Sequence, residues 1–202
     1  FAFVLRVEDD DGGVTTLSGT FPVANEPPAY VYTYCPQIVG CLPTRWEGEA
    51  TDNWAIVGDP GSDDITFSWD WGDGTPGESA TYYNDGVGPD PPRSPNGTFP
   101  FGASDNRAHA YGDDGAYTIR VAAGDDDGGA APNSAVVTIL NLPPSLTVPP
   151  AQVVATDEGT LVSLDATSTD PGSDDLTFAW AWQYGPTDTH AYYNDGVGPD
   201  PP

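Results

Sequence analysis

Apolar and polar residues alternate along short stretches of this chain, and turn-forming residues separate the stretches. The clearest is 65–71, read ITFSWDW, in which four apolar side chains alternate with Thr, Ser and Asp. Period-two alternation predicts a strand with one face in a core and the other in water. An acidic turn, 59–64, precedes this stretch, and the glycine-rich turn 72–76 ends it. Several short strands without a helical period predict an all-β sandwich.

The same succession of strands and turns returns along the chain. The acidic turns that begin at Asp9 and Asp125 are 116 residues apart (125 − 9), and residues 82–92 recur unchanged at 192–202. We therefore expect a tandem repeat protein. Residues 1–24 would be the last strands of one repeat, residues 25–140 a complete repeat, and residues 141–202 the first part of a third.

The complete repeat is predicted to hold seven strands, and its third strand carries the aromatic core. The predicted strands lie at about 29–34, 52–58, 65–71, 78–83, 106–111, 117–123 and 135–140. Phe67, Trp69 and Trp71 share one face of the third strand, and an immunoglobulin-like core uses a buried Trp on that strand. The predicted fold is thus all-β, as tandem immunoglobulin-like sandwiches.

Three motifs resemble those of the polycystic-kidney-disease (PKD) domain family. The segment 67–75, FSWDWGDGT, resembles the family's WDFGDGT motif, 109–119 resembles its H-x-Y…G-x-Y-x-V segment, and 125–128 resembles its closing D-D-x-G turn. The resemblance covers residues 25–140 and implies an immunoglobulin-like sandwich of extracellular and cell-surface proteins. Such modules occur in tandem in surface-layer proteins, adhesins and secreted hydrolases. Residues 180–185 lack the acids of the first motif, and the loop 84–106 is longer than the family's.

The charge composition of the chain restricts the classes of molecule that it could bind. Five basic residues, all Arg, face 31 acidic residues, for a formal net charge of −26. Phosphate-rich partners such as nucleic acid and acidic membranes are therefore excluded. No apolar run has membrane length and no signal peptide is present, and the chain begins within a strand, so we expect a segment of a longer secreted protein.

Two local features bear on the compartment. Cys35 and Cys41 are predicted to form a disulfide, which implies an oxidising, extracellular or cell-surface location; free thiols in the cytosol are the alternative. Asn96 begins an Asn-Gly-Thr sequon and is a candidate glycosylation site.

Strand order places the acidic turns at one pole of the repeat. If successive strands alternate in direction, the turns 59–64 and 125–127 and the loop 84–90 meet where the linker 25–28 enters. The turns 72–76 and 111–115 lie at the other pole, facing the next repeat. Crowded carboxylates favour a bound cation, and clustered Asp oxygens suit Ca²⁺. The alternative is a set of solvated turn acids on a highly charged or halophilic surface protein.

The predicted Ca²⁺ ligands come from this turn chemistry in each repeat. They are Asp9, Asp10, Asp11, Asp59, Asp63, Asp64, Asp125, Asp126, Asp127, Asp170, Asp174 and Asp175. A second candidate loop and its copy would contribute Asn84, Asp85, Asp90, Asn194, Asp195 and Asp200.

Catalysis is not predicted. The two histidines, His109 and His190, stand in no Ser/His/Asp arrangement, and carboxylates are too abundant for any pair to indicate glycoside hydrolysis. The predicted function is structural: a segment of an extracellular filament, stalk or adhesin, stiffened by Ca²⁺ at its junctions, with copies of itself and surface glycans as partners. Residues 1–24 of one chain could also complete residues 141–202 of another.

The alternative function is an accessory module of a secreted hydrolase that binds carbohydrate or protein. Exposed aromatics would grip the ligand, with Tyr82, Tyr83, Tyr192 and Tyr193 as candidates. Neighbouring residues of a strand point to opposite faces, so one Tyr of each pair is expected in a core.

Overall fold

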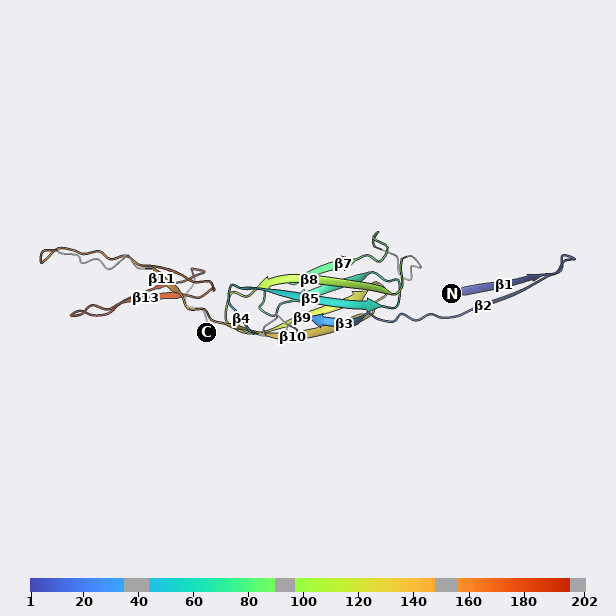
Figure 1. Cartoon of the computed structure of the whole chain (residues 1–202), viewed down its shortest axis with the longest axis horizontal. Coiled ribbons are helices and arrows are strands. Elements are labelled where there is room, and N and C mark those ends of the chain that lie inside the picture. The colour runs from blue at the N-terminus through green and yellow to red at the C-terminus, as the bar shows by residue number, and fades with distance from the viewer. Residues whose placement is uncertain (35–43, 90–96, 148–155, 197–202) are drawn as a thin grey trace.

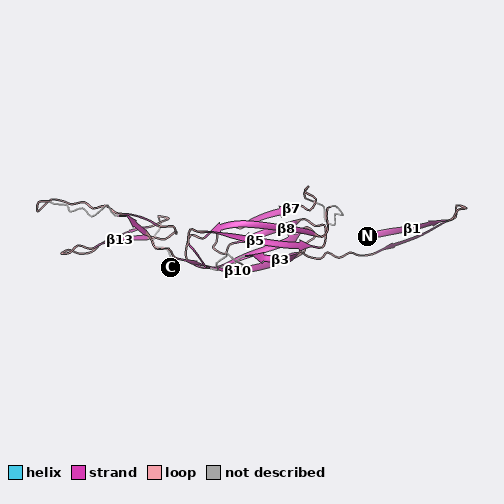
Figure 2. Ribbon diagram, in the orientation of Figure 1, coloured by secondary structure: helices cyan, strands magenta, loops and turns pink. Residues whose placement is uncertain are grey.

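The computed structural model describes residues 1–34, 44–89, 97–147 and 156–196, and in these residues every regular element is a strand (Figures 1 and 2). None of the described residues forms a helix long and apolar enough to cross a membrane. The strands are β1 (Ala2–Glu8), β2 (Val14–Thr20), β3 (Ala29–Tyr34), β4 (Thr44–Trp46), β5 (Ala50–Asp59), β6 (Ile65–Asp70), β7 (Glu78–Tyr82), β8 (Phe101–Ala110), β9 (Gly115–Asp125), β10 (Ala130–Leu140), β11 (Ser145–Thr147), β12 (Thr167–Thr169), β13 (Leu176–Trp180) and β14 (Asp188–Tyr192).

Two sheets form the central sandwich. One has the order β3-β5-β8, and the other has the order β4-β10-β9-β6-β7. All pairs within them are antiparallel except β4 with β10, which run parallel over three residues. This arrangement is that of an immunoglobulin-like β-sandwich, which confirms the predicted fold class.

Side chains of alternating strand positions fill the space between the sheets. Phe67 and Ile65 are fully buried, Trp69 is 4% exposed and Trp71 is 1% exposed, as the alternation predicted for this strand. They pack with buried residues of the facing sheet, Ala55, Val57 and Ala103, and of β9 and β10 in their own sheet, Ile119, Val121, Ala123, Val137 and Ile139. Removing apolar surface from water stabilises a fold by about 25 cal/mol per Å², so this cluster is the main source of stability.

Aromatic rings continue the core to one pole. Trp71 stacks on His109 at 4.6 Å between ring centroids, and His109 meets Tyr111 edge-on at 4.8 Å. The His109 Nε2 and the Asp73 Oδ2 are hydrogen-bonded at 2.7 Å, so this histidine has a structural role near the end of β8.

Most predicted strands are found within two or three residues of their expected limits. Two differ: β8 begins at Phe101 rather than near 106, and β10 begins at Ala130 rather than near 135. The pairing of β5 with β8 extends over ten residues, so long-range hydrogen bonds prolong strands past their apolar stretch. The short strand β4 was not predicted.

The segments that flank the sandwich lie along its long axis (Figure 1). β1 and β2 form a hairpin that projects from the end where residues 25–28 enter. At the other end, β13 pairs with β14 as β6 pairs with β7. Phe178 meets Tyr192 edge-on at 5.6 Å, as Phe67 meets Tyr82 at 5.7 Å. The local geometry is thus repeated, while the division of the chain at residues 24 and 140 stays a prediction.

Four predicted features lie outside the described residues. They are the Cys35–Cys41 disulfide, the Asn96 sequon and the candidate ligands Asp90 and Asp200.

Candidate metal site

Three loops meet at the pole where the linker enters the sandwich, as strand order predicts. The backbone N–H of Asp64 donates to Asp126 Oδ1 at 3.0 Å, and Asp64 Oδ1 accepts the N–H of Asn84 at 2.9 Å. Asp64 is 3% exposed, so its carboxylate braces the turn 59–64 against the two neighbouring loops. The local fold therefore crowds acidic residues together before any ion is considered.

Asp59, Asp63 and Asp125 form the first acidic cluster at this pole. Each offers a carboxylate oxygen, and these oxygens lie within 4.8 Å of one another. Asp59 is 1% exposed; its Oδ1 accepts the N–H of Gly61 at 2.6 Å, while its Oδ2 is buried without a hydrogen bond. The side-chain amide of Asn25 donates to Asp125 Oδ2 at 2.9 Å, which ties the entering linker to the cluster.

The electrostatics of this cluster favour a proton or a cation. Burial, with the charges of Asp59, Asp126, Asp125 and Asp127, raises the pKa of Asp63 to about 6. Burial is also the main cause that raises the pKa of Asp59, although the Gly61 N–H opposes it. A carboxylate with a raised pKa lacks compensation for its charge, and a bound cation would supply that compensation.

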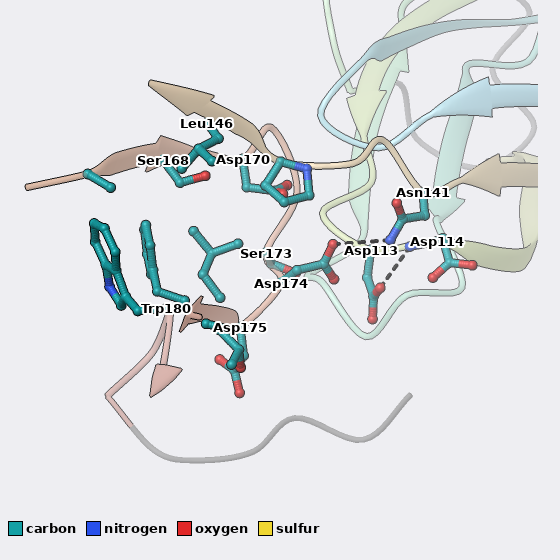
Figure 3. Close-up of a pocket in the computed structure, with 16 residues that line it drawn as sticks. Asp113, Asp114, Asn141, Leu146, Ser168, Asp170, Ser173, Asp174, Asp175 and Trp180 are labelled. Atoms are coloured by element: carbon teal, nitrogen blue, oxygen red, sulfur yellow. Dashed lines mark hydrogen bonds between the residues drawn. The ribbon is translucent and has the colours of Figure 1, made fainter. Parts of the chain in front are cut away.

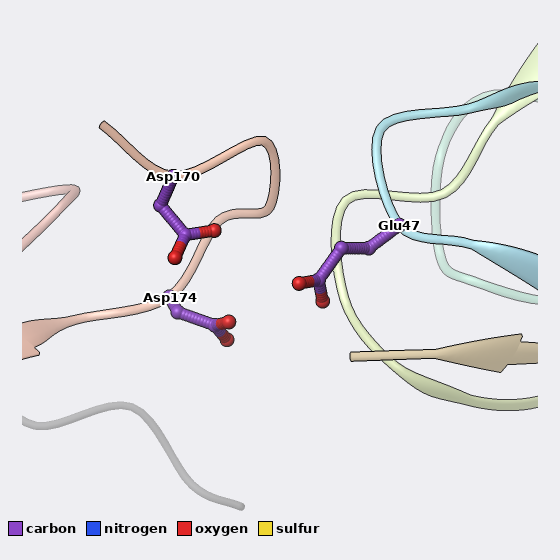
Figure 4. Close-up of side chains that lie close together, drawn as sticks. All are labelled: Glu47, Asp170 and Asp174. Carbon is purple, nitrogen blue, oxygen red and sulfur yellow. The ribbon is translucent and has the colours of Figure 1, made fainter. Parts of the chain in front are cut away.

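A second cluster joins the sandwich to the following segment (Figure 4). Glu47 lies in the turn between β4 and β5. Its carboxylate faces Asp170 and Asp174, which belong to the turn before β13. Oxygens of the three side chains lie within 4.8 Å of one another. Glu47 is 1% exposed, and both Glu47 Oε2 and Asp170 Oδ2 are buried without a hydrogen bond.

The second cluster has the same electrostatic character as the first. Burial raises the pKa of Glu47, and the charges of Asp174, Asp170 and Asp114 add to it against the opposing N–H of Leu142. Burial and the charge of Asp170 raise the pKa of Asp174.

Both clusters suit a hard cation. Ca²⁺ binds oxygens at about 2.3–2.6 Å, so two of its ligands can stand about 4.8 Å apart across the ion. The oxygens of each cluster meet that limit. Buried, unpartnered carboxylate oxygens are the feature that distinguishes these clusters from solvated turn acids, because an unpaired buried oxygen is costly without a ligand.

Sequence reasoning missed Glu47. Nothing in the local sequence TRWEGEA marks this glutamate, and its role depends on contact with residues more than 120 positions later. The one available signal was its place in a turn at the pole predicted to face the next repeat.

The other predicted ligands fall outside the two clusters. Asp126 and Asp64 serve the loop contacts described above, and Asp127 lies in the same turn. In the β1–β2 hairpin, Asp9, Asp10 and Asp11 are exposed, and Asp9 Oδ1 accepts the N–H of Gly13. Asp175 repeats the role of Asp64, because its Oδ1 accepts the N–H of Asn194 at 2.9 Å.

The second candidate loop is held by its own hydrogen bonds. Asn84 donates from its amide to the carbonyl of Thr98 at 2.7 Å, and Asp85 Oδ1 accepts the N–H of Val87. Among the described residues, the groups of three acids that could share an ion do not include Asp85 or Asp195.

A pocket of about 650 Å³ adjoins the second cluster (Figure 3). Asp113, Asp114, Asp170 and Asp174 line its acidic end, where Asn141 donates to Asp174 Oδ2 at 3.5 Å. Apolar side chains, among them Leu146 and Trp180, line the other end. The acidic end therefore lies between the sandwich and the following segment, and the apolar end lies within that segment.

Among solved structures, the comparisons found a likeness to a PKD domain. No protein-family model matches the chain, and no curated protein has a matching sequence. The chain is similar to the solved PKD domain of an M14-like peptidase from Thermoplasmatales archaeon SCGC AB-540-F20, at 21% sequence identity and a TM-score of 0.37. The match covers 57% of this chain and 98% of that one.

Proposed function

We propose that this chain is a structural segment of tandem immunoglobulin-like modules in an extracellular filament, stalk or cell-surface adhesin. In this proposal Ca²⁺ binds at the acidic pole of each repeat and stiffens the junction with its neighbour. The observation that carries the proposal is Asp59, whose Oδ2 is buried and unpartnered beside Asp63 and Asp125.

The position of the cluster supports a role at the junction. The side-chain amide of the linker residue Asn25 is hydrogen-bonded to Asp125, and Glu26 adds its negative charge near Asp59. An ion held there would neutralise carboxylates and fix the linker against the sandwich at the same time. Successive modules would then point in one direction, as a stalk or filament requires.

The surroundings of His109 support a role without catalysis. His109 lies between the rings of Trp71 and Tyr111 and is bonded to Asp73, so the ring is used in packing. The partners proposed for such a segment are further copies of the same module and surface glycans.

The alternative is a binding module of a secreted hydrolase, and exposed aromatics favour it. Tyr83 is 41% exposed and Trp54 is 48% exposed, whereas Tyr82 turns inward and donates to Asp105 Oδ1. Retention on insoluble polysaccharide or collagen that is lost with Tyr83→Ala would favour this second function over the first.

Calcium removal tests the structural proposal. We expect the melting temperature of the 202-residue chain to rise by several degrees when Ca²⁺ replaces chelator, because a ligand at 100 times its Kd stabilises the folded state by about 2.7 kcal/mol. Asp63→Asn should reduce this rise to the part contributed by the second cluster, which does not contain Asp63. It should also raise the melting temperature in chelator, because it removes a crowded charge. Differential scanning calorimetry measures both.

The charge-matched control is Asp188→Asn, on the exposed face of β14. It should leave the calcium-dependent rise intact. Equal melting temperatures of the unaltered chain in Ca²⁺ and in excess chelator would refute the calcium proposal.

A further inference from the structure

We infer that Glu47 is a calcium ligand supplied across the junction, so that one ion is held by two successive repeats. This inference rests on the proposed function and adds to it a residue outside the acidic turns. It makes the cation site a property of the junction rather than of a single sandwich.

Glu47 is built into the contact between the sandwich and the following segment. Its Oε1 accepts the N–H of Leu142 at 2.6 Å, and its Oε2 is left buried without a hydrogen bond beside Asp170 and Asp174 (Figure 4). A side chain that is 1% exposed, with one oxygen fixed and the other unpaired, is poised to bind a cation.

Close backbone contacts hold both sides of the site. The N–H of Ser173 donates to the carbonyl of Gly112 at 2.6 Å. A Cβ at Gly172 would stand 2.7 Å from the Glu47 carboxyl carbon, and one at Gly48 would stand 2.6 Å from the carbonyl oxygen of Pro171. These glycines allow the two segments to approach closely enough for one ion to reach both.

The two acidic clusters occupy equivalent positions in successive repeats, and each contains part of the same set of ligands. Asp170 and Asp174 match Asp59 and Asp63 at a shift of 111, and the N–H of Gly172 bonds to Asp170 Oδ1 as that of Gly61 bonds to Asp59 Oδ1. The third carboxylate differs between the clusters. Asp125 belongs to the same sandwich as Asp59 and Asp63, whereas Glu47 belongs to the sandwich that precedes Asp170 and Asp174.

The ligands of the two clusters, taken together, give the ligand set expected at a complete junction. It would contain two carboxylates from the acidic turn, one from the turn after β9 and one from the preceding repeat. The described part of residues 141–202 has no counterpart of β9 and β10, so at the second junction the cross-junction glutamate is the third carboxylate. Four carboxylates plus backbone carbonyls and water approach the six to eight oxygens that Ca²⁺ takes.

Calorimetric titration of the 202-residue chain with CaCl₂ tests the inference. We expect two ions per chain, one for each cluster. Glu47→Gln, which keeps the side-chain shape, should weaken one of the two sites at least about tenfold and leave the other unchanged. The matched control is Glu49→Gln, in the same turn, which should leave both affinities unchanged.

Small-angle scattering supplies a second readout. Ca²⁺ should narrow the distribution of molecular dimensions in the unaltered chain and in Glu49→Gln. In Glu47→Gln it should narrow the distribution less, because the remaining ion fixes only the linker at the other pole of the sandwich.

The outcomes separate the inference from the proposed function. Two unchanged sites in Glu47→Gln would overturn the inference and leave the calcium proposal standing. A single site that is lost with Asp63→Asn and kept in Glu47→Gln would do the same. Absence of any calcium binding to the unaltered chain would overturn both.

Discussion

Asp105 shows at the residue scale how a charge is accommodated inside the sandwich. It is 4% exposed on β8 and accepts hydrogen bonds from Trp69 Nε1 at 2.8 Å, Tyr82 Oη at 2.7 Å and Arg107 Nε at 3.0 Å. Burial opposes its ionisation, but these donors outweigh burial and hold the pKa of Asp105 below its usual value. Here the protein supplies the compensation that Asp59 and Glu47 lack.

We expect Asp105→Ala to destabilise the sandwich by about 3 kcal/mol, because it leaves two buried donors and a guanidinium without their acceptor. Denaturant unfolding measures the change. The control is Asn106→Ala, the next residue of β8, whose side chain is exposed and which should change stability by about 0.5 kcal/mol or less. Equal effects of the two substitutions would contradict the network.

The lowered pKa also sets a pH dependence. A carboxylate with a depressed pKa contributes stability above its unfolded pKa of about 3.9 and loses it as the pH falls toward the folded value. The stability difference between the unaltered chain and Asp105→Asn should therefore be constant above about pH 5 and shrink below pH 4. A difference that grows on acidification would show that the sign is wrong.

At the scale of elements, local pattern predicted the strands whose two faces differ. The alternation in 65–71 gave both the existence of β6 and its buried face. The local pattern could not predict β4, because three residues are too few to show an alternation. This strand forms because it pairs with β10, more than 90 residues away in the sequence. For the same reason, the early start of β8 lies in its pairing with β5 rather than in its own residues.

The turn after β6 depends on two glycines that differ in their surroundings. Gly72 (φ 79°) and Gly74 (φ 84°) both adopt left-handed conformations, but a Cβ at Gly72 would stand 2.5 Å from the carbonyl oxygen of Thr118, whereas one at Gly74 would meet nothing within 4 Å. Strain applies to both positions, and a backbone clash applies to Gly72 alone.

We expect Gly74→Ala to cost about 1 kcal/mol, the cost of a left-handed alanine, and Gly72→Ala to cost about 3 kcal/mol or more. Urea unfolding of the pair measures the two values, and each variant is the control for the other. A Gly74→Ala variant as unstable as Gly72→Ala would exclude the contact between this turn and β9 as the cause.

At the scale of the whole molecule, charge dominates the solution behaviour. A formal net charge of −26 on 202 residues makes the folded chain repel itself, and the repulsion is greatest where the acidic turns meet. The sequence predicted that the turns 59–64 and 125–127 meet at this pole, and Asp59, Asp63 and Asp125 lie close together there. It could not predict Glu47, because no single repeat contains both that residue and its partners.

Screening should therefore stabilise the chain in the absence of calcium. Raising NaCl from about 0.01 M to about 1 M shortens the screening length from about 30 Å to about 3 Å. We expect the melting temperature in chelator to rise by several degrees. A neutral osmolyte at equal osmolality is the control, and a melting temperature that falls with NaCl would contradict self-repulsion.

The parallel pairing of β4 with β10 determines how the sandwich meets tension. The chain enters at the acidic pole and leaves after Leu140 at the opposite pole, and Thr44, Arg45 and Trp46 face Thr138, Ile139 and Leu140. A pull on the two ends draws these strands lengthwise in opposite directions. Their hydrogen bonds are then sheared together rather than opened one after another, so the load is shared across the pair. The strand least visible in the sequence would thus share such a load with β3, which pairs with β5.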